Sequence, residues 1–155
     1  CKKNATIENR TQHIERILAK EDDIGLSKLD SYRTFQDDID QIKNSFLSFL
    51  IQAKAENKKV AGYGAAAKGN TLLNYAGVKP DLIPYICDLA ESKQGKYTPG
   101  SHIPILDRSY LKEDKPDYVI IFPWNIAEEI INDNKYISEW GGRFVVAVPS
   151  LEIIE

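Results

Sequence analysis

Several residue types are scarce in this sequence, and their scarcity excludes several kinds of site. The 155 residues include only two cysteines and two histidines, and no metal-binding spacing such as HxxxH or CxxC joins them. Two cysteines cannot form a disulfide framework or, by themselves, a cysteine-ligated zinc cluster. We therefore expect no metal in this chain, and we expect a reducing, cytoplasmic location.

Long apolar runs and an excess of basic charge are also absent. No apolar stretch approaches the roughly 20 residues that a membrane span needs. The formal net charge is −3, which argues against a nucleic-acid surface or a basic patch for membranes, so neither partner is expected. Methionine is missing even at position 1, and we expect the chain to be a fragment of a longer protein.

The hydrophobic pattern changes near residue 57. Before that point, apolar residues recur every three or four positions in two segments, which predicts a helical extension or linker over residues 1–57. After it, short continuous apolar runs alternate with helical segments, a pattern typical of parallel strands buried on both faces. The sequence therefore predicts an α/β fold in which residues 58–155 form a Rossmann-like, mostly parallel sheet flanked by helices, preceded by an N-terminal helical extension. Four strands are expected, over residues 58–64, 82–88, 117–123 and 143–149.

A glycine turn follows the first predicted strand, in the stretch VAGYGAAAKGN. Gly62 and Gly64, with Ala67 three residues on, match a dinucleotide-binding fingerprint between a strand and a helix. Asp88 ends the next strand, where dinucleotide enzymes keep an acid that binds ribose. A short strand–helix turn also needs glycine for its backbone conformation alone, so this fingerprint has a structural interpretation as well.

The helix that follows the turn carries three further candidates. Gly69 lies on the helical face expected to pack on the sheet, so its lack of a side chain has a structural explanation. Lys68 and Asn70 lie off that face, in or beside the first turn. Because the N-terminus of a helix is its positive end, a lysine there is unfavourable unless an anion is present. These two residues favour an anion-binding turn.

Two more polar clusters follow later strands. One loop carries Lys93, Gln94, Lys96, Tyr97 and His102, and Trp124 and Asn125 come directly after the strand at 117–123. Ligands of open parallel sheets bind outside the carboxyl ends of the strands, so these clusters and the glycine turn are expected to form one site. Each cluster also has a structural interpretation, because loop lysines are usually solvated and an asparagine after a strand often caps a helix.

Four segments of the chain resemble the C-terminal domain of SAM-dependent sugar C-methyltransferases, which methylate a carbon of a nucleotide-linked deoxysugar. They are GYGAAAKGNTLLNYAGV, DLIPYICDLAESKQGKYTPGSHIPI, PDYVIIFPWNIAEEI and WGGRFVVAVP. The resemblance implies that SAM and a structural zinc belong to other parts of the parent protein. This chain would then hold no cofactor, no catalytic residue and no methyl-transfer activity of its own.

The same resemblance implies that this domain holds the nucleotide-linked sugar beside the parent's own SAM-binding domain. Contacts with the substrate are then expected from the glycine turn and its helix, from the loop and from the segment after the third predicted strand. The residues concerned are Gly64, Ala65, Lys68, Gly69, Asn70, Lys93, Gln94, Tyr97, His102, Trp124 and Asn125.

Two other functions remain open from the residues alone. The first is an NAD(P)-binding Rossmann domain of an oxidoreductase or sensor, in which Asp88 would contact a ribose. The second is a docking module without a small ligand. Its helix with Phe35, Ile39, Ile42 and Phe46 on one side would pack on a neighbouring domain or pair two copies into a homodimer.

Overall fold

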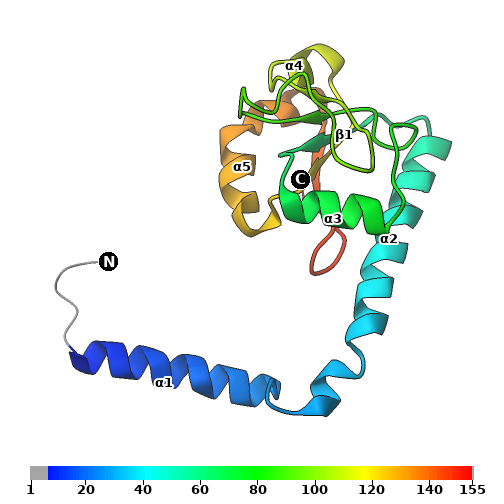
Figure 1. The fold of residues 1–155 in the computed structure, drawn as a ribbon. Coiled ribbons are helices and arrows are strands. Elements are labelled where there is room, and N and C mark those ends of the chain that lie inside the picture. Colours follow the sequence, from blue (N-terminus) through cyan, green and yellow to red (C-terminus); the bar gives the residue numbers. More distant parts are fainter. Residues whose placement is uncertain (1–6, 155) are drawn as a thin grey trace. The chain divides into compact units, whose positions relative to one another are not determined.

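The computed structural model describes residues 7–154, apart from the side chains of residues 7–10. The chain forms two compact units, Cys1–Asp40 and Gln41–Glu155. Figure 1 labels their helices and strands. The division after residue 57 stays a prediction, since the helix α2 (Phe35–Ala55) begins in the first unit and ends in the second.

The first unit contains the helix α1 (Ile7–Ile24) and the short 3-10 helix η1 (Leu29–Tyr32). Two side chains of η1 hold the turn that joins α1 to η1. Ser31 Oγ donates to the carbonyl of Ile24 at 3.3 Å, and Tyr32 OH donates to that of Leu26 at 2.7 Å. The N-terminal helix of the predicted extension is therefore present. Within residues 7–154, no helix combines the length and the hydropathy of a membrane-spanning segment.

The second unit is built on one six-stranded sheet with the strand order β3-β2-β1-β4-β5-β6. The first five strands are parallel, and β6 pairs antiparallel with β5. The bounds are β1 Val60–Tyr63, β2 Ile86–Cys87, β3 Ile105–Leu106, β4 Tyr118–Ile121, β5 Arg143–Val146 and β6 Glu152–Ile154. The mostly parallel sheet confirms the predicted fold class, whereas β3 and β6 were not predicted.

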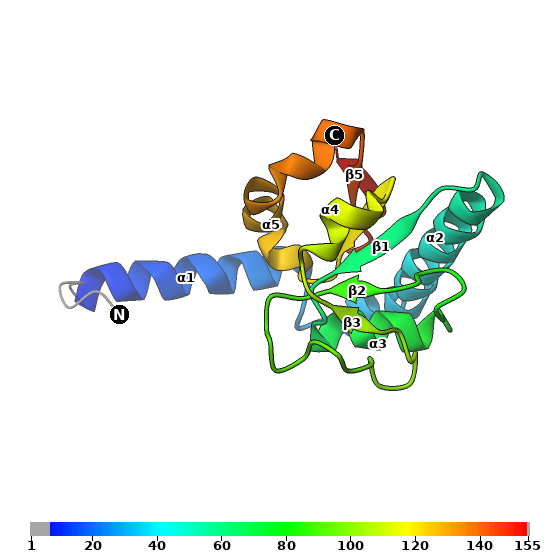
Figure 2. The ribbon, with the colours of Figure 1, turned by 90° about the horizontal axis from the view of Figure 1, so that it is seen from above.

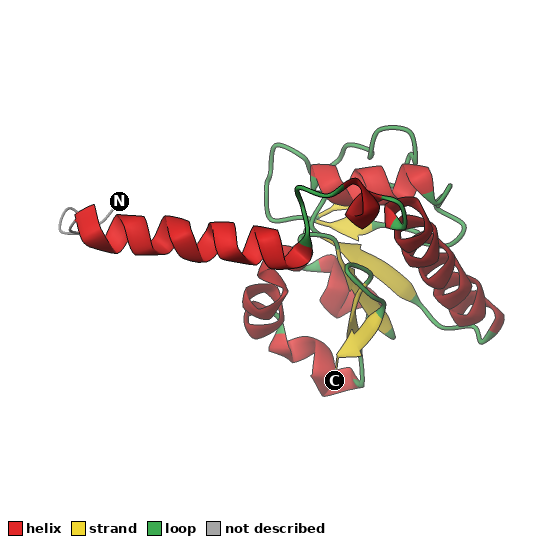
Figure 3. Cartoon of the chain, turned by 90° about the horizontal axis from the view of Figure 1, so that it is seen from below, coloured by secondary structure: helices red, strands yellow, loops and turns green. Residues whose placement is uncertain are grey.

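Helices cover both faces of this sheet, as Figures 2 and 3 show. The C-terminal part of α2 and the helix α3 pack on one face, while α4, α5 and η3 pack on the other. The bounds are α3 Ala67–Tyr75, α4 Tyr110–Asp114, η2 Trp124–Ile126, α5 Ala127–Asp133 and η3 Lys135–Trp140. Because each parallel strand is buried on both sides, its sequence reads as a continuous apolar run.

Two apolar cores result, one on each face of the sheet. On the first face, Phe46 and Leu50 of α2, both 0% exposed, pack with Leu73 of α3 against the strands. On the second, Leu111 of α4 and Ile137 of η3 are likewise 0% exposed. Burying a side chain of this size contributes about 1.5–3 kcal/mol. These cores hold the strand ends, and the segments that follow them, in fixed positions.

Two glycines bring the turn after β1 close to the segment after β4. Gly64 has a positive φ of +82°, and a Cβ on it would lie 2.5 Å from Pro123 Cγ. Gly69 packs on Phe122, since a Cβ there would lie 2.5 Å from Phe122 Cβ. The close packing of α3 on Phe122 accounts for the missing side chain of Gly69, as the structural interpretation expects.

Candidate functional site

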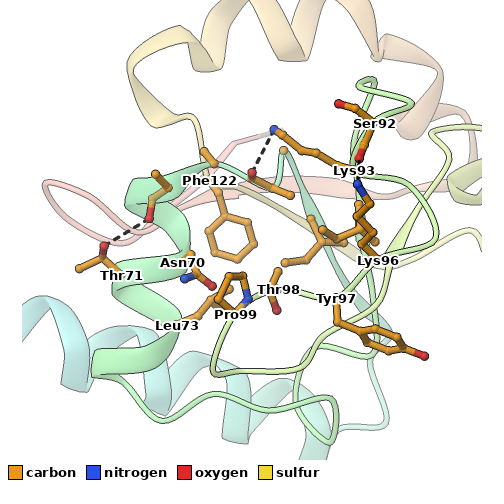
Figure 4. Close-up of a pocket in the computed structure, with 16 residues that line it drawn as sticks. Asn70, Thr71, Leu73, Ser92, Lys93, Lys96, Tyr97, Thr98, Pro99 and Phe122 are labelled. Carbon is orange, nitrogen blue, oxygen red and sulfur yellow. Dashed lines mark hydrogen bonds between the residues drawn. The ribbon is translucent and has the colours of Figure 1, made fainter.

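A cavity of about 730 Å³ opens near the carboxyl ends of the first strands. Figure 4 shows it between α3 and the loop over residues 89–104, with the ring of Phe122 facing its middle and the ring of Tyr97 turned away. The lining combines an apolar floor with polar walls. Its residues are Gly64, Ala65, Ala66, Ala67, Asn70, Thr71, Leu73, Ile86, Ser92, Lys93, Lys96, Tyr97, Thr98, Pro99, Ile105 and Phe122.

The buried carboxylate of Asp88 holds the glycine turn in place through hydrogen bonds. Asp88 is 7% exposed and accepts hydrogen bonds from the amides of Ala65 and Ala90, at 2.7 and 2.8 Å. Lys93 Nζ lies 3.0 Å from the same carboxylate and also donates to the carbonyl of Ala65, at 3.0 Å. Burial by itself raises the pKa of Asp88, but the bonds from Ala90, Lys93 and Ala65 outweigh it, and the pKa lies below its ordinary value.

Hydrogen bonds within the protein already use the backbone amides of Gly64 and Ala65, two of the residues expected to contact the substrate. The amide of Gly64 donates to the carbonyl of Cys87 at 2.7 Å, and the amide of Ala65 donates to Asp88. The next amides, of Ala67, Lys68 and Gly69, have no acceptor among residues 7–154. Because the first amides of a helix lack partners inside the helix, these three can receive an anion.

Asn70 presents a polar group without a partner at the edge of this cavity. Its Oδ1 is buried and accepts no hydrogen bond from the described part of the chain. Buried acceptors in folded proteins are almost always satisfied, so an isolated one needs an explanation. A donor on a bound molecule provides one, because Asn70 is among the residues that line the cavity.

The loop over residues 89–104 forms the outer wall of the cavity, and several hydrogen bonds hold it in place. Asn74 Nδ2 of α3 donates to the carbonyl of Pro99 at 2.9 Å, and Lys79 Nζ donates to that of Gly100 at 2.6 Å. The amide of Ile105 donates to the carbonyl of Lys96 at 2.8 Å, which ties the wall to β3. The loop is therefore a fixed side of the cavity.

Lys96 brings positive charge to this wall. Its Nζ donates to the carbonyl of Ser92 at 2.6 Å, and no carboxylate of the described residues pairs with it. An ammonium group with only a neutral acceptor retains its attraction for an anion. Lys93, by contrast, is engaged with Asp88 and contributes mainly to the closure of the turn.

A second cluster lies on the other side of the turn. Lys68 Nζ donates to Oδ1 of Asn125 and lies 4.7 Å from the centre of the Trp124 ring. Trp124 and Asn125 belong to a separate cavity of about 500 Å³, which is lined by η2, the first turn of α5 and the segment from Val146 to Ile154. The structure thus brings Lys68 to Trp124 and Asn125, but none of these three residues lines the first cavity.

The predicted site residues fall into three groups. Five line the first cavity, namely Gly64, Ala65, Asn70, Lys93 and Tyr97. Three form the second cluster, namely Lys68, Trp124 and Asn125. The remaining three are Gly69, Gln94 and His102, which line neither cavity. Gln94 Nε2 instead donates to the carbonyl of Asp88 and to Asp107, at 2.9 and 3.1 Å, and His102 is exposed with a φ of +57°.

Several lining residues were not predicted. The apolar floor, with Ile86 and Ile105, comes from strands whose sequences do not differ from those of ordinary core strands. Thr98 and Pro99 belong to the long loop, whose length was the one available signal. Among residues 7–154, no group of three or more His, Cys, Asp or Glu side chains could hold a metal ion.

Comparison with known proteins places the chain in a family. The family model described as the C-methyltransferase C-terminal domain matches residues 1–149. Among curated proteins, the chain is similar to the C-methyltransferase NovU of Streptomyces niveus, with 36% identity over 141 residues. The match covers 91% of this chain and 34% of NovU, so the chain spans about a third of the length of that relative. The chain therefore belongs to the family of C-methyltransferase C-terminal domains.

Proposed function

We propose that this domain holds a nucleotide-linked ketodeoxysugar for a SAM-dependent C-methyltransferase. The observation that carries the proposal is the cavity of about 730 Å³, a size typical of small-molecule sites. Its lining includes Lys96, which has no carboxylate partner among residues 7–154, and Ala67, whose amide has no acceptor in that range. The family and the similarity to NovU, a C-methyltransferase by name, support the reaction class.

The two chemical halves of the cavity suit the two halves of such a substrate. The diphosphate would lie at the N-terminus of α3 beside Lys96, where amides and an ammonium group both attract anionic oxygens. The apolar floor around Phe122 and Ile86 would take the base or the deoxy part of the sugar. Asn70 Oδ1 would then accept a hydrogen bond from a hydroxyl or N–H group of the ligand.

The contribution of this chain to methylation would be positioning. In the parent enzyme, a base would remove the proton next to the sugar's keto group, and the enolate carbon would attack the methyl group of SAM. A carbon–carbon bond forms and the carbon–sulfur bond breaks, which leaves the neutral thioether. SAM, the structural zinc and the base are expected elsewhere in the parent protein, while this domain would fix the sugar so that its carbon meets the methyl group.

The dinucleotide alternative has less support. It requires Asp88 to contact a ribose and the turn amides to contact a pyrophosphate. Asp88 instead accepts the amides of Ala65 and Ala90 and pairs with Lys93. Binding of NAD(H) in the usual way would have to break this network.

Thermal-shift and calorimetric titrations of the 155-residue chain test the proposal. We expect a thymidine or uridine diphosphate sugar to raise the Tm, since a ligand that binds the folded state stabilises it, whereas NADH and SAM leave the Tm unchanged. Lys96→Ala should raise the Kd of the sugar nucleotide roughly tenfold, a loss of about 1.4 kcal/mol in binding free energy, because a charged contact is lost. Lys135→Ala removes an exposed lysine outside the cavity and serves as the control. Stabilisation by NADH but by no sugar nucleotide would refute the proposal.

A further inference from the structure

Lys68 carries a positive charge that no carboxylate in the described part of the chain balances. The residue lies in the first turn of α3, and its contacts are the neutral amide oxygen of Asn125 and the ring of Trp124. Among residues 7–154, no ion pair involves this lysine. The positive end of α3 adds to the electrostatic cost of placing an ammonium group there. An additional anion near Lys68 would therefore be favourable.

The position of Lys68 in the fold also points to a ligand. The strand order β3-β2-β1-β4-β5-β6 reverses direction between β1 and β4, and ligands of such sheets bind at this reversal. Lys68 follows β1, and Trp124 and Asn125 follow β4. The contact of Gly64 with Pro123 holds the two segments together.

Lys68 directly follows a residue that lines the first cavity, although its own side chain points toward Trp124. Lys68 adjoins Ala67, which lines that cavity from the same turn of α3. The lysine side chain has a flexible four-carbon stem, so its ammonium group can exchange Asn125 Oδ1 for an anionic acceptor bound at the same turn. Nothing covalent has to change for this exchange.

We propose that Lys68 is an exchangeable counter-charge for the diphosphate of the ligand. When a nucleoside diphosphate occupies the first cavity, an oxygen of the diphosphate replaces Asn125 Oδ1 as the acceptor of Lys68. In the unliganded domain, Trp124 and Asn125 keep the ammonium group near the reversal of the strand order. This inference rests on the proposed function and adds a specific role for Asn125, which is a positioning residue without a contact to the ligand.

The substitution Asn125→Asp separates this role from a structural one. A carboxylate at this position would pair with Lys68 and compete with the diphosphate. We expect a Tm equal to or higher than that of the wild-type chain without ligand, together with a roughly tenfold weaker Kd for thymidine and uridine diphosphates by calorimetry. Lys68→Gln should raise the Kd of the same two diphosphates by a similar factor. A structural role alone would raise the Tm of Asn125→Asp and leave the Kd unchanged, and that result would overturn the inference.

A matched control is available on the opposite face of the sheet. Lys112 Nζ lies 4.6 Å from the centre of the Tyr136 ring, so Lys112→Gln removes another lysine stacked on an aromatic ring, and its Kd should equal that of the wild type. Thymidine and uridine, which lack the diphosphate and its charge, should bind all variants with the same Kd. Unchanged diphosphate binding by both Lys68→Gln and Asn125→Asp would refute this inference alone, whereas a wild-type chain that binds neither diphosphate would refute the proposed function as well.

Discussion

Replacing Asp88 by asparagine tests whether its carboxylate closes the glycine turn. The three donors that meet the carboxylate are the amides of Ala65 and Ala90 and the ammonium of Lys93, at 2.7, 2.8 and 3.0 Å. Hydrogen bonds to a charged group contribute about 1.5–3 kcal/mol each. Asparagine keeps one acceptor oxygen, but its NH₂ group would face a donor. We therefore expect Asp88→Asn to lose about 3 kcal/mol of stability, the worth of roughly two such bonds.

Urea unfolding at several pH values provides the measurement. For a domain of this size, a loss of about 3 kcal/mol corresponds to a fall in Tm of roughly 6 to 12 °C. The pKa of Asp88 is lower in the folded state than in the unfolded state, so its contribution is complete above the unfolded value of about 3.9. It is lost as the pH falls through the lower folded pKa. The difference in unfolding free energy between wild type and Asp88→Asn should therefore be constant from pH 7 to 5 and shrink below about pH 4.

A surface carboxylate gives the matched control. Asp81 pairs with Lys54 at 3.3 Å, and its side chain is 62% exposed. Asp81→Asn makes the same chemical change in a solvated ion pair and should alter stability by less than about 0.5 kcal/mol. An Asp88→Asn variant as stable as Asp81→Asn, or a difference that stays constant down to pH 2, would show that the carboxylate does not hold the turn.

Two further predictions concern the packing of the same unit. Gly69→Ala should destabilise the domain by about 1–2 kcal/mol in urea, because overpacking against Phe122 outweighs the gain in helix propensity, and an unchanged midpoint would contradict the packing described. Cys87 is fully buried, and burial raises the pKa of its thiol to about 12, so with the other cysteine changed to serine it should react with a thiol reagent at pH 8 only as fast as the domain unfolds. Rapid labelling without denaturant would be inconsistent with that burial.

The sequence predicted the parts of the fold that carry their own hydrophobic signal. The runs that became β1, β4 and β5 are apolar apart from Arg143 at the start of β5, because these strands are covered on both faces. The strands β3 and β6 have two and three residues and were missed. Strands this short depend on hydrogen bonds from a neighbour, as when the amide of Ile86 donates to Pro104 beside β3, and local pattern contains little of that information.

The candidate site was predictable as an edge of the sheet but not as an arrangement of side chains. The strand tips that bear Lys68 and Asn125 do meet, as their position after β1 and β4 indicated. Their separation from the cavity depends on which face of α3 each residue occupies, since Ala67 and Asn70 face the cavity and Lys68 faces Trp124. The hydrogen bond from the Ala65 amide to the Asp88 carboxylate depends on a side-chain orientation that no sequence pattern specifies.

The fastening of the outer wall of the cavity has a consequence for how this domain diversifies. Asn74 and Lys79 grip the loop through the carbonyl oxygens of Pro99 and Gly100, which every amino acid possesses. An exposed side chain on the loop, such as that of Tyr97, can therefore be exchanged by evolution without loosening the wall, whereas Gly100 cannot, because a Cβ there would lie 2.0 Å from Asn74 Oδ1. A change of substrate can proceed by single substitutions on a scaffold that keeps its shape.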